Sequence, residues 1–144
     1  MEHRFEIFKQ ANDITFINDS KSTNGLSIAS ALSNCVDLKI NRLVLILGGK
    51  SKGIDYSNYI DSSLIDILII AYGEAADEIK NKLPEYGVHV IKDFTEAVHY
   101  AIKISEKSSF NGVLLSPGCS SFDQFNNFEH RGNIFKDIVE THYS

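Results

Sequence analysis

The sequence predicts an α/β fold in three layers, with an open, mostly parallel sheet between helices and a β-hairpin at its N-terminus. Two continuous apolar runs, residues 43–47 and 65–71, are typical of parallel strands that are buried on both faces. Segments with helical spacing of apolar residues alternate with these runs, which is the pattern of βαβ units. At 144 residues the chain has the length of one domain, and such a domain buries about 68–70% of its unfolded surface.

The chain begins with two short strand-forming runs, residues 5–8 and 14–17. The turn-prone pair Asn12 and Asp13 separates them, so we expect an antiparallel hairpin. A helix is expected next, because apolar residues recur at helical spacing. Those residues are Leu26, Ala29, Leu32 and Val36.

The second half of the chain continues the alternation of helices and strands. Residues 88–91 and 112–115 have the composition of two further strands. Pro84 is expected to end one helix, and Asp93 with Glu96 is expected to cap the next. The whole pattern predicts a Rossmann-like arrangement. The apolar stripe of the helix before Pro84 is Ala75, Ala76, Ile79 and Leu83, and that of the last helix is Phe125, Phe128, Phe135, Ile138 and Val139.

Composition excludes several classes of function. The chain has 14 Lys and Arg residues against 19 Asp and Glu residues, whereas a generic nucleic-acid binder needs a clustered basic surface. The longest apolar runs are far shorter than the roughly 20 residues that span a bilayer. Neither the two cysteines nor the histidines show metal-ligand spacing. We therefore expect a cytoplasmic protein with no metal site that binds neither nucleic acid nor membrane.

Three polar segments each follow a strand-forming run directly: residues 18–24, 48–53 and 116–121. Ligands of open α/β sheets bind at the carboxyl ends of the parallel strands, where loops and helix N-termini gather. Any one of these segments is explained about equally well as an ordinary turn of Gly, Ser and Asn. Their occurrence at three strand ends favours one shared binding site.

The familiar catalytic and nucleotide motifs do not fit these segments. Residues 49–51 resemble the end of a phosphate-binding loop, but its first glycine would fall on Val44 inside a strand. The glycines of residues 48–53 lack the dinucleotide-binding spacing. A nucleophile elbow at Ser116 would need a glycine where Leu114 stands. We therefore expect no catalytic residue in this chain alone.

The polar segments instead have the composition of a binding site for carboxylates. Lys21 and Lys52 supply cations, and an ionic hydrogen bond is worth roughly 1.5–3 kcal/mol. Taken singly, each lysine is better explained as a solvated surface charge, so the inference rests on the group. Asp19 either accepts from ribose hydroxyls or a cation, or caps the turn that follows it. The candidate hydroxyl groups are those of Ser20, Thr23, Ser116, Ser120 and Ser121.

Two other residues leave alternatives open. Cys119 would be a nucleophile if a helix N-terminus stabilised its thiolate, but no partner histidine lies nearby in sequence. An inert buried thiol is the better interpretation. Phe128 is explained most simply as a member of the apolar stripe, and a ligand contact at the start of the helix is the alternative.

Four ordered motifs together resemble the Mur ligase family, and the resemblance covers nearly the whole chain. It is similar to the C-terminal domain of the members that add D-glutamate, because members that add later residues tend to carry an Asp-Tyr-Ala-His type of sequence at positions 18–21. The motifs are His3-Arg4-Phe5-Glu6, Asn18-Asp19-Ser20-Lys21-Ser22-Thr23-Asn24, Leu47-Gly48-Gly49 with Lys52, and Leu114-Leu115-Ser116-Pro117-Gly118-Cys119-Ser120-Ser121-Phe122-Asp123, followed by Asn127-Phe128-Glu129-His130-Arg131-Gly132-Asn133-Ile134-Phe135.

The resemblance implies a three-domain ligase whose third domain is this chain, residues 1–144. Of the two N-terminal domains absent here, one would hold the UDP-sugar and the central one would bind most of the ATP and Mg²⁺. The family reaction activates the carboxylate of UDP-N-acetylmuramoyl-L-alanine as an acyl phosphate, which the amino group of D-glutamate attacks. This domain would close over the ATP site, would be inactive alone, and is expected to be a monomer.

The resemblance also implies which residues bind which ligand. One group would hold the carboxylates of D-glutamate, and the other would face the ribose and phosphates of the nucleotide. The first group is Thr23, Lys52, Ser121, Phe122 and Phe128, and the second is Arg4, Asp19 and Lys21, with Asp19 toward the ribose hydroxyls.

Gly25 and Gly118 depart from the family pattern. A bulkier residue is usual at position 25, and alanine is commoner at position 118. Neither change removes a residue expected to bind a ligand. Because glycine is the most flexible residue, we expect both to loosen their loops.

Two other classes of function provide alternatives. The chain could be a free-standing module that binds a nucleotide or an amino acid without any ligase activity. A cofactor domain of an oxidoreductase is disfavoured, because the dinucleotide fingerprint is missing.

Overall fold

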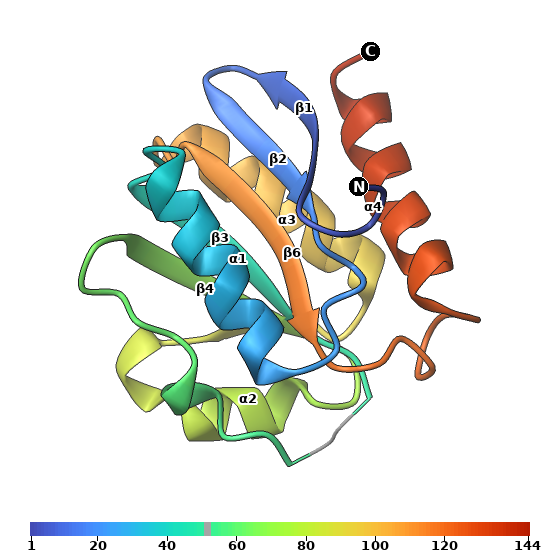
Figure 1. Cartoon of the computed structure of the whole chain (residues 1–144). Helices are drawn as coiled ribbons and strands as arrows, with labels where there is room; N and C mark the ends of the chain where they lie inside the picture. The colour runs from blue at the N-terminus through green and yellow to red at the C-terminus, as the bar shows by residue number, and fades with distance from the viewer. Residues whose placement is uncertain (51–52) are drawn as a thin grey trace.

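The fold is built around one sheet of six strands in the order β1-β2-β6-β3-β4-β5. The computed structural model describes residues 1–50 and 53–144. Helices cover both faces of the sheet, so the protein has three layers (Figure 1). The strands are β1 (Glu6–Ala11), β2 (Ile14–Asn18), β3 (Arg42–Gly48), β4 (Asp66–Tyr72), β5 (His89–Val90) and β6 (Gly112–Gly118), and the helices are α1 (Gly25–Asp37), α2 (Ala76–Lys82), α3 (Phe94–Lys107) and α4 (Phe128–His142), with short 3-10 helices η1 (Tyr56–Asn58) and η2 (Pro84–Tyr86).

The strand pairing confirms the predicted fold class. β1 and β2 form an antiparallel hairpin, in which Glu6 lies opposite Asn18. From β2 to β5 the neighbouring strands run parallel to one another. The central strands β3 and β6 are buried along almost their whole length, as expected of strands covered on both faces.

A hydrophobic core lies on each face of the sheet. Leu43, Leu45 and Leu47 of β3 point toward the core under α1 and α2, whereas Val44 and Ile46 point toward the core under α3 and α4. This alternation follows from the pleat of the strand. No described helix is both long enough and apolar enough to cross a bilayer.

The apolar face predicted for α1 is partly wrong: Leu32 is buried and Val36 packs against the core as predicted, but Leu26 does not. Its buried side chains are Ile28, Ala31, Leu32 and Cys35, whereas Leu26 is 73% exposed. Both sets of residues have helical spacing and share Leu32, and packing on the sheet decides which one is buried.

The last helix also begins later than its apolar pattern predicts. Asn127 caps α4, because its side-chain oxygen accepts from the His130 N–H at 2.7 Å. Phe125 therefore precedes the helix, although its ring packs edge-on against Phe94 with 4.9 Å between centroids. Asp93 caps α3 as predicted, since its side chain accepts from the Glu96 N–H.

The exits of β2, β6 and β3 lie at one edge of the sheet, because these strands are parallel neighbours. β6 continues past the predicted run to Gly118. Its arrowhead marks this edge at the bottom of Figure 1, where the chain leaves toward the start of α4. The described parts of the three polar segments therefore meet at this edge, as predicted.

Gly25 and Gly118 have the opposite role to the one expected, because both are closely packed. A Cβ atom on Gly25 would lie 2.1 Å from Cδ2 of Tyr59. One on Gly118 would lie 2.5 Å from Cδ1 of Ile28, and the residue has a positive φ of 75°. Both positions require glycine for close approach.

Replacing Gly25 with Ala is expected to destabilise the protein by about 1–3 kcal/mol, because the added methyl group would overlap the Tyr59 ring. Helix propensity alone would make the Ala variant more stable. The sign of the change in the free energy of unfolding therefore shows whether propensity or the overlap with Tyr59 dominates. Urea unfolding measures it, with Ser33→Ala on the exposed face of α1 as the control. A Gly25→Ala variant as stable as the wild type would contradict the packing argument.

Candidate functional site

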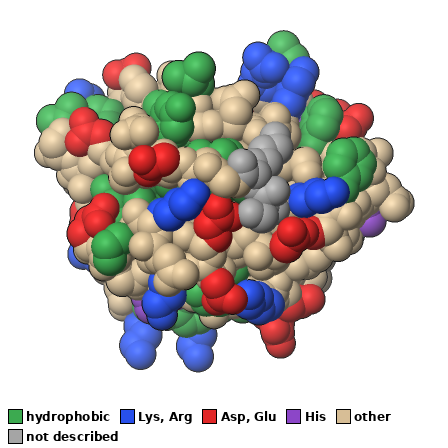
Figure 2. All heavy atoms as spheres, turned by 90° about the horizontal axis from the view of Figure 1, so that it is seen from below, with side chains coloured by type: hydrophobic (Ala, Val, Ile, Leu, Met, Phe, Trp, Pro, Cys, Tyr) green, Lys and Arg blue, Asp and Glu red, His purple; other side chains and the backbone are tan. Residues whose placement is uncertain are grey.

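The loops at the carboxyl edge of the sheet are joined by backbone hydrogen bonds. Figure 2 looks onto this edge from below, where Lys and Arg side chains are interspersed with Asp and Glu. The backbone hydrogen bonds link the exits of β2, β3, β4 and β6, so the loops form one continuous surface. These bonds run from Ala75 N–H to the Gly49 carbonyl (2.9 Å), from Lys50 N–H to the Ser120 carbonyl (3.0 Å), and from Gly118 N–H to the Ser22 carbonyl (3.1 Å).

A fully buried arginine, Arg131 of α4, joins the exits of β2, β4 and β6. Its Nε donates to Ser20 Oγ at 2.9 Å, and its Nη2 donates to the Ser20 carbonyl at 2.7 Å. Its Nη1 donates to the Tyr72 hydroxyl and to the Cys119 carbonyl, both at 3.0 Å. All four acceptors are neutral, so the guanidinium adds positive potential to this edge of the sheet.

Sequence reasoning missed Arg131, although a signal for it exists. Arg131, Phe135 and Val139 recur every four residues, and all three are buried. A charged residue in phase with a buried stripe indicates a polar network, since an unpaired buried charge is costly. The neighbouring residue must be glycine, because a Cβ atom on Gly132 would lie 2.2 Å from Nδ1 of His3.

A cavity of about 400 Å³ lies between the N-terminal segment and α1. Its lining includes Arg4, Asp19 and Lys21, which are the three residues expected to face the nucleotide. The structure therefore brings this group together. One side of the cavity is the polar face of α1, with Ser27, Ser30 and Asn34.

Asp19 is only 6% exposed and is held by two hydrogen bonds. Its Oδ1 accepts from the Phe5 N–H and its Oδ2 accepts from Ser116 Oγ, both at 2.8 Å. Burial raises the pKa of this carboxyl, while the two hydrogen bonds and the nearby Arg4 charge oppose the rise. A carboxylate accepts about four hydrogen bonds, so Asp19 has capacity left for a ligand.

The N-terminal segment that carries Arg4 has an unusual backbone. His3 and Phe5 have φ values of 63° and 41°, in the left-handed region. Such residues cost about 1–3 kcal/mol each and persist only where their surroundings hold them. Here Lys21 N–H donates to the His3 carbonyl at 2.9 Å, and Phe5 N–H donates to Asp19, as described.

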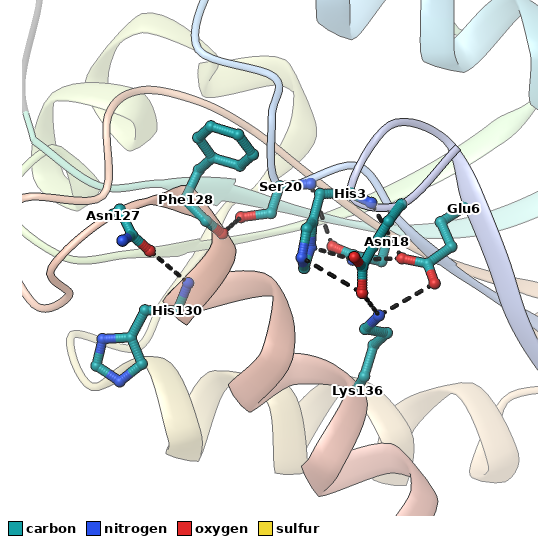
Figure 3. A network of polar contacts seen from close by, with 9 residues as sticks. His3, Glu6, Asn18, Ser20, Asn127, Phe128, His130 and Lys136 are labelled. Carbon is teal, nitrogen blue, oxygen red and sulfur yellow. Dashed lines mark hydrogen bonds and ion pairs between the residues drawn. The ribbon is translucent and has the colours of Figure 1, made fainter.

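Phe128, at the start of α4, lies beside Lys21 and His3 and does not join the apolar stripe. Its half-buried ring is edge-on to the His3 ring, with 6.0 Å between centroids, and Nζ of Lys21 lies 5.9 Å from the ring centroid. The Phe128 carbonyl accepts from Ser20 Oγ at 2.7 Å (Figure 3). Interpreting this residue as core is therefore wrong, and its contact with D-glutamate stays a prediction.

The other residues expected to bind D-glutamate come from separate loops. Thr23 is half-buried and follows Ser22, which is bonded to the exit of β6. Ser121 is buried, whereas Phe122 is 66% exposed. Lys52 lies outside the described residues. The role of these residues toward D-glutamate stays a prediction.

Two serines that were candidate ligand hydroxyls are used inside the protein instead. Ser20 and Ser116 are both fully buried. Ser20 Oγ is engaged by Phe128 and Arg131, and Ser116 Oγ is bonded to Asp19. These hydroxyls hold the loops in place and do not face a ligand.

Cys119 is buried, and its Sγ lies 2.8 Å from the Tyr56 hydroxyl. This environment supports the interpretation of an inert thiol. Over residues 1–50 and 53–144, no three His, Cys, Asp or Glu side chains converge in a way that could hold a metal ion.

Comparison with known proteins identifies the family. Residues 3–119 match the family model described as Mur ligase, glutamate ligase domain. The chain belongs to the Mur ligase family. It is 41% identical over 145 aligned positions to a UDP-N-acetylmuramoylalanine–D-glutamate ligase of Elusimicrobium minutum, which covers 98% of this chain and 31% of the relative. The corresponding ligase of Desulfitobacterium hafniense is 36% identical, with 99% of this chain and 31% of the relative covered.

Solved structures of Mur ligases and folylpolyglutamate synthases share the fold. The murein peptide ligase of Psychrobacter arcticus has a TM-score of 0.65 at 17% identity, over 96% of this chain and 29% of that one. A bifunctional folylpolyglutamate synthase/dihydrofolate synthase of Yersinia pestis, complexed with AMPPNP and a Mn ion, has a TM-score of 0.63 at 16% identity, over 99% of this chain and 32% of that one. At such identities the likeness establishes the fold alone.

Replacing Arg131 with Met is expected to destabilise the protein by about 2–4 kcal/mol, because it leaves buried acceptors at Ser20, Tyr72 and Cys119 without donors. Urea unfolding measures the loss. Arg42→Met is the matched control. Arg42 forms an exposed ion pair with Asp66 at 3.6 Å that is worth about 0–1 kcal/mol, and its guanidinium lies 4.4 Å from the Phe110 ring centroid, a contact worth about 0.5–1 kcal/mol at an exposed site. Equal losses for the two variants would contradict the role assigned to Arg131.

Asp19→Asn is expected to gain stability relative to the wild type as the pH rises. Because the folded pKa of Asp19 lies above its usual value of 3.8, the folded protein keeps a proton that the unfolded chain has released. Wild-type stability therefore falls as the pH rises from 3.8 through the folded pKa. Urea unfolding of both proteins across this range measures the difference, which should level off above it. A difference that shrinks with rising pH would contradict the desolvation of Asp19.

Proposed function

We propose that this chain is the C-terminal domain of a cytoplasmic, monomeric ligase that joins D-glutamate to UDP-N-acetylmuramoyl-L-alanine in peptidoglycan synthesis, with conversion of ATP to ADP and phosphate. Relatives of that name that are 36–41% identical over nearly the whole chain carry the proposal. The chain spans about 31% of their length. Two further domains would hold the UDP-sugar and the ATP phosphate loop.

The cavity beside α1 has the chemistry to hold part of ATP, which would supply the phosphoryl group that activates the muramoyl carboxylate. Asp19 has free acceptor capacity for the two ribose hydroxyls. Arg4 and Lys21 line the same cavity and would contact the phosphates. Mg²⁺ would be bound mainly by the central domain.

The loops after β2, β3 and β6 would hold D-glutamate. Lys52, Thr23 and Ser121 would bind its two carboxylates, with Phe122 and Phe128 beside its aliphatic part. The positive potential of the buried Arg131 favours an anion at this edge. Anchoring both carboxylates fixes the direction of the amino group, and such positioning lowers a barrier by several kcal/mol, up to about 7–11 in favourable cases.

The full-length protein is expected to release ADP only when D-glutamate and UDP-N-acetylmuramoyl-L-alanine are both present. Thr23→Ala and Lys52→Ala should each lower kcat/KM for D-glutamate about tenfold or more, because each removes a hydrogen bond to a charged group. Thr95→Ala on the exposed face of α3 is the control. Normal D-glutamate-dependent ADP release in both variants would contradict the site assignment, and hydrolysis of ATP by the 144-residue chain alone would contradict its dependence on the other domains.

A further inference from the structure

The position of Arg4 depends on the two residues that flank it. Both His3 and Phe5 have positive φ values, and Arg4 N–H donates to the Met1 carbonyl at 3.1 Å in a tight turn. Residues with side chains adopt this backbone conformation only where neighbouring groups hold it. The location of the Arg4 side chain at the cavity is therefore set by whatever holds this turn.

Part of the support comes from the cavity itself, through Lys21 N–H to the His3 carbonyl and Phe5 N–H to Asp19. The buried His3 ring is also held by Nδ2 of Asn18, which lies 2.8 Å from its Nδ1. Glu6 supplies further support. Its Oε1 accepts from the His3 N–H at 3.1 Å and from Nδ2 of Asn18 at 2.9 Å. Glu6 therefore joins the turn to the last residue of β2, directly before Asp19.

Lys136 of α4 holds Glu6 in this position. Its Nζ lies 3.0 Å from Oε2 of Glu6 and 3.1 Å from Oε2 of Glu2, and its side chain is only 16% exposed (Figure 3). Burial alone would raise the pKa of Glu6, but hydrogen bonds from His3, Asn18 and Lys136 outweigh it, so the net pKa is lowered. Glu6 is thus a carboxylate that its partners keep charged.

We propose that Lys136 is a positioning residue for the nucleotide half of the site. Its single positive charge is shared by Glu2 and Glu6 and fixes Glu6 against the turn, and the turn places Arg4 at the cavity beside Asp19 and Lys21. Lys136 acts through Glu6 and does not touch the ligand. The proposal rests on the proposed function for the identity of the ligand, ATP.

Removing this ammonium group leaves two neighbouring carboxylates without their shared cation. Their repulsion works against the position of Glu6 and so against the bonds that hold the turn. The consequence should be larger for the nucleotide half than for the D-glutamate half. Arg131 and separate backbone bonds hold the loop after β6, and the contact of Phe128 with the His3 ring is a weaker link between the halves.

The test compares Lys136→Met, Lys136→Arg and a control, Lys103→Met on the exposed surface of α3, in the full-length protein. Lys136→Met is expected to raise KM for ATP about three- to tenfold and to leave KM for D-glutamate within about twofold. Lys136→Arg should have a KM for ATP close to that of the wild type, because arginine keeps the positive charge and the hydrogen-bond donors. A merely structural role would reduce the active fraction and kcat without separating the two KM values.

Amide hydrogen exchange of the 144-residue chain provides the second measurement. Exchange at Phe5 and Lys21 should be about three- to tenfold faster in Lys136→Met than in the wild type or in Lys103→Met. A folded Lys136→Met variant with unchanged exchange, or with equal changes in both KM values, overturns the proposal. If the wild type shows no D-glutamate-dependent ADP release, the proposed function fails. The role of Lys136 is then decided by two other measurements, the amide exchange rates and the affinity for a fluorescent ATP analogue.

Discussion

The arrangement of the site depends on the buried guanidinium of Arg131. Three strand exits that are far apart in the sequence meet at its N–H groups, with Ser20, Tyr72 and Cys119 as acceptors. A planar group with fixed donor directions permits little relative movement of the loops that it joins. The loops can therefore be polar and rich in glycine and still keep one geometry, because α4 holds them from the side of the core.

The same edge concentrates features that cost stability. Asp19 is buried as a carboxylate, and His3 and Phe5 adopt a backbone conformation that residues with side chains avoid. Such features persist at binding sites, where they orient groups toward a ligand. Here they gather around one cavity. The chain carries a net charge of -5, yet the cations Arg4 and Lys21 line this cavity. The electrostatic potential in the cavity is therefore less negative than the net charge of the chain suggests.

The sequence predicted the elements well because the strands are continuous apolar runs and because Asn12, Asp13, Pro84 and Asp93 mark their limits. It could not decide which face of α1 packs, since two sets of residues have helical spacing and only the sheet selects Ile28 over Leu26. Arg4, Asp19 and Lys21 were grouped as one site only through the resemblance of the sequence to the Mur ligase family. Sequence reasoning missed the roles of Arg131 and Lys136, because their partners come from other elements of the fold. Ser20 lies 111 positions from Arg131, and Glu6 lies 130 positions from Lys136.

The exits of the parallel strands are proposed to form one binding edge for a nucleotide and a dicarboxylate. The most direct measurement is an NMR titration of the isotope-labelled chain with an ATP analogue and with D-glutamate. The nucleotide should shift the amide signals of residues 3–5 and 19–22, and D-glutamate should shift those of Thr23 and of residues 118–128. Shifts at the opposite edge of the sheet, around Asn41, Asp66 and Glu85, would contradict this proposal, as would an unchanged spectrum at millimolar concentrations of both ligands.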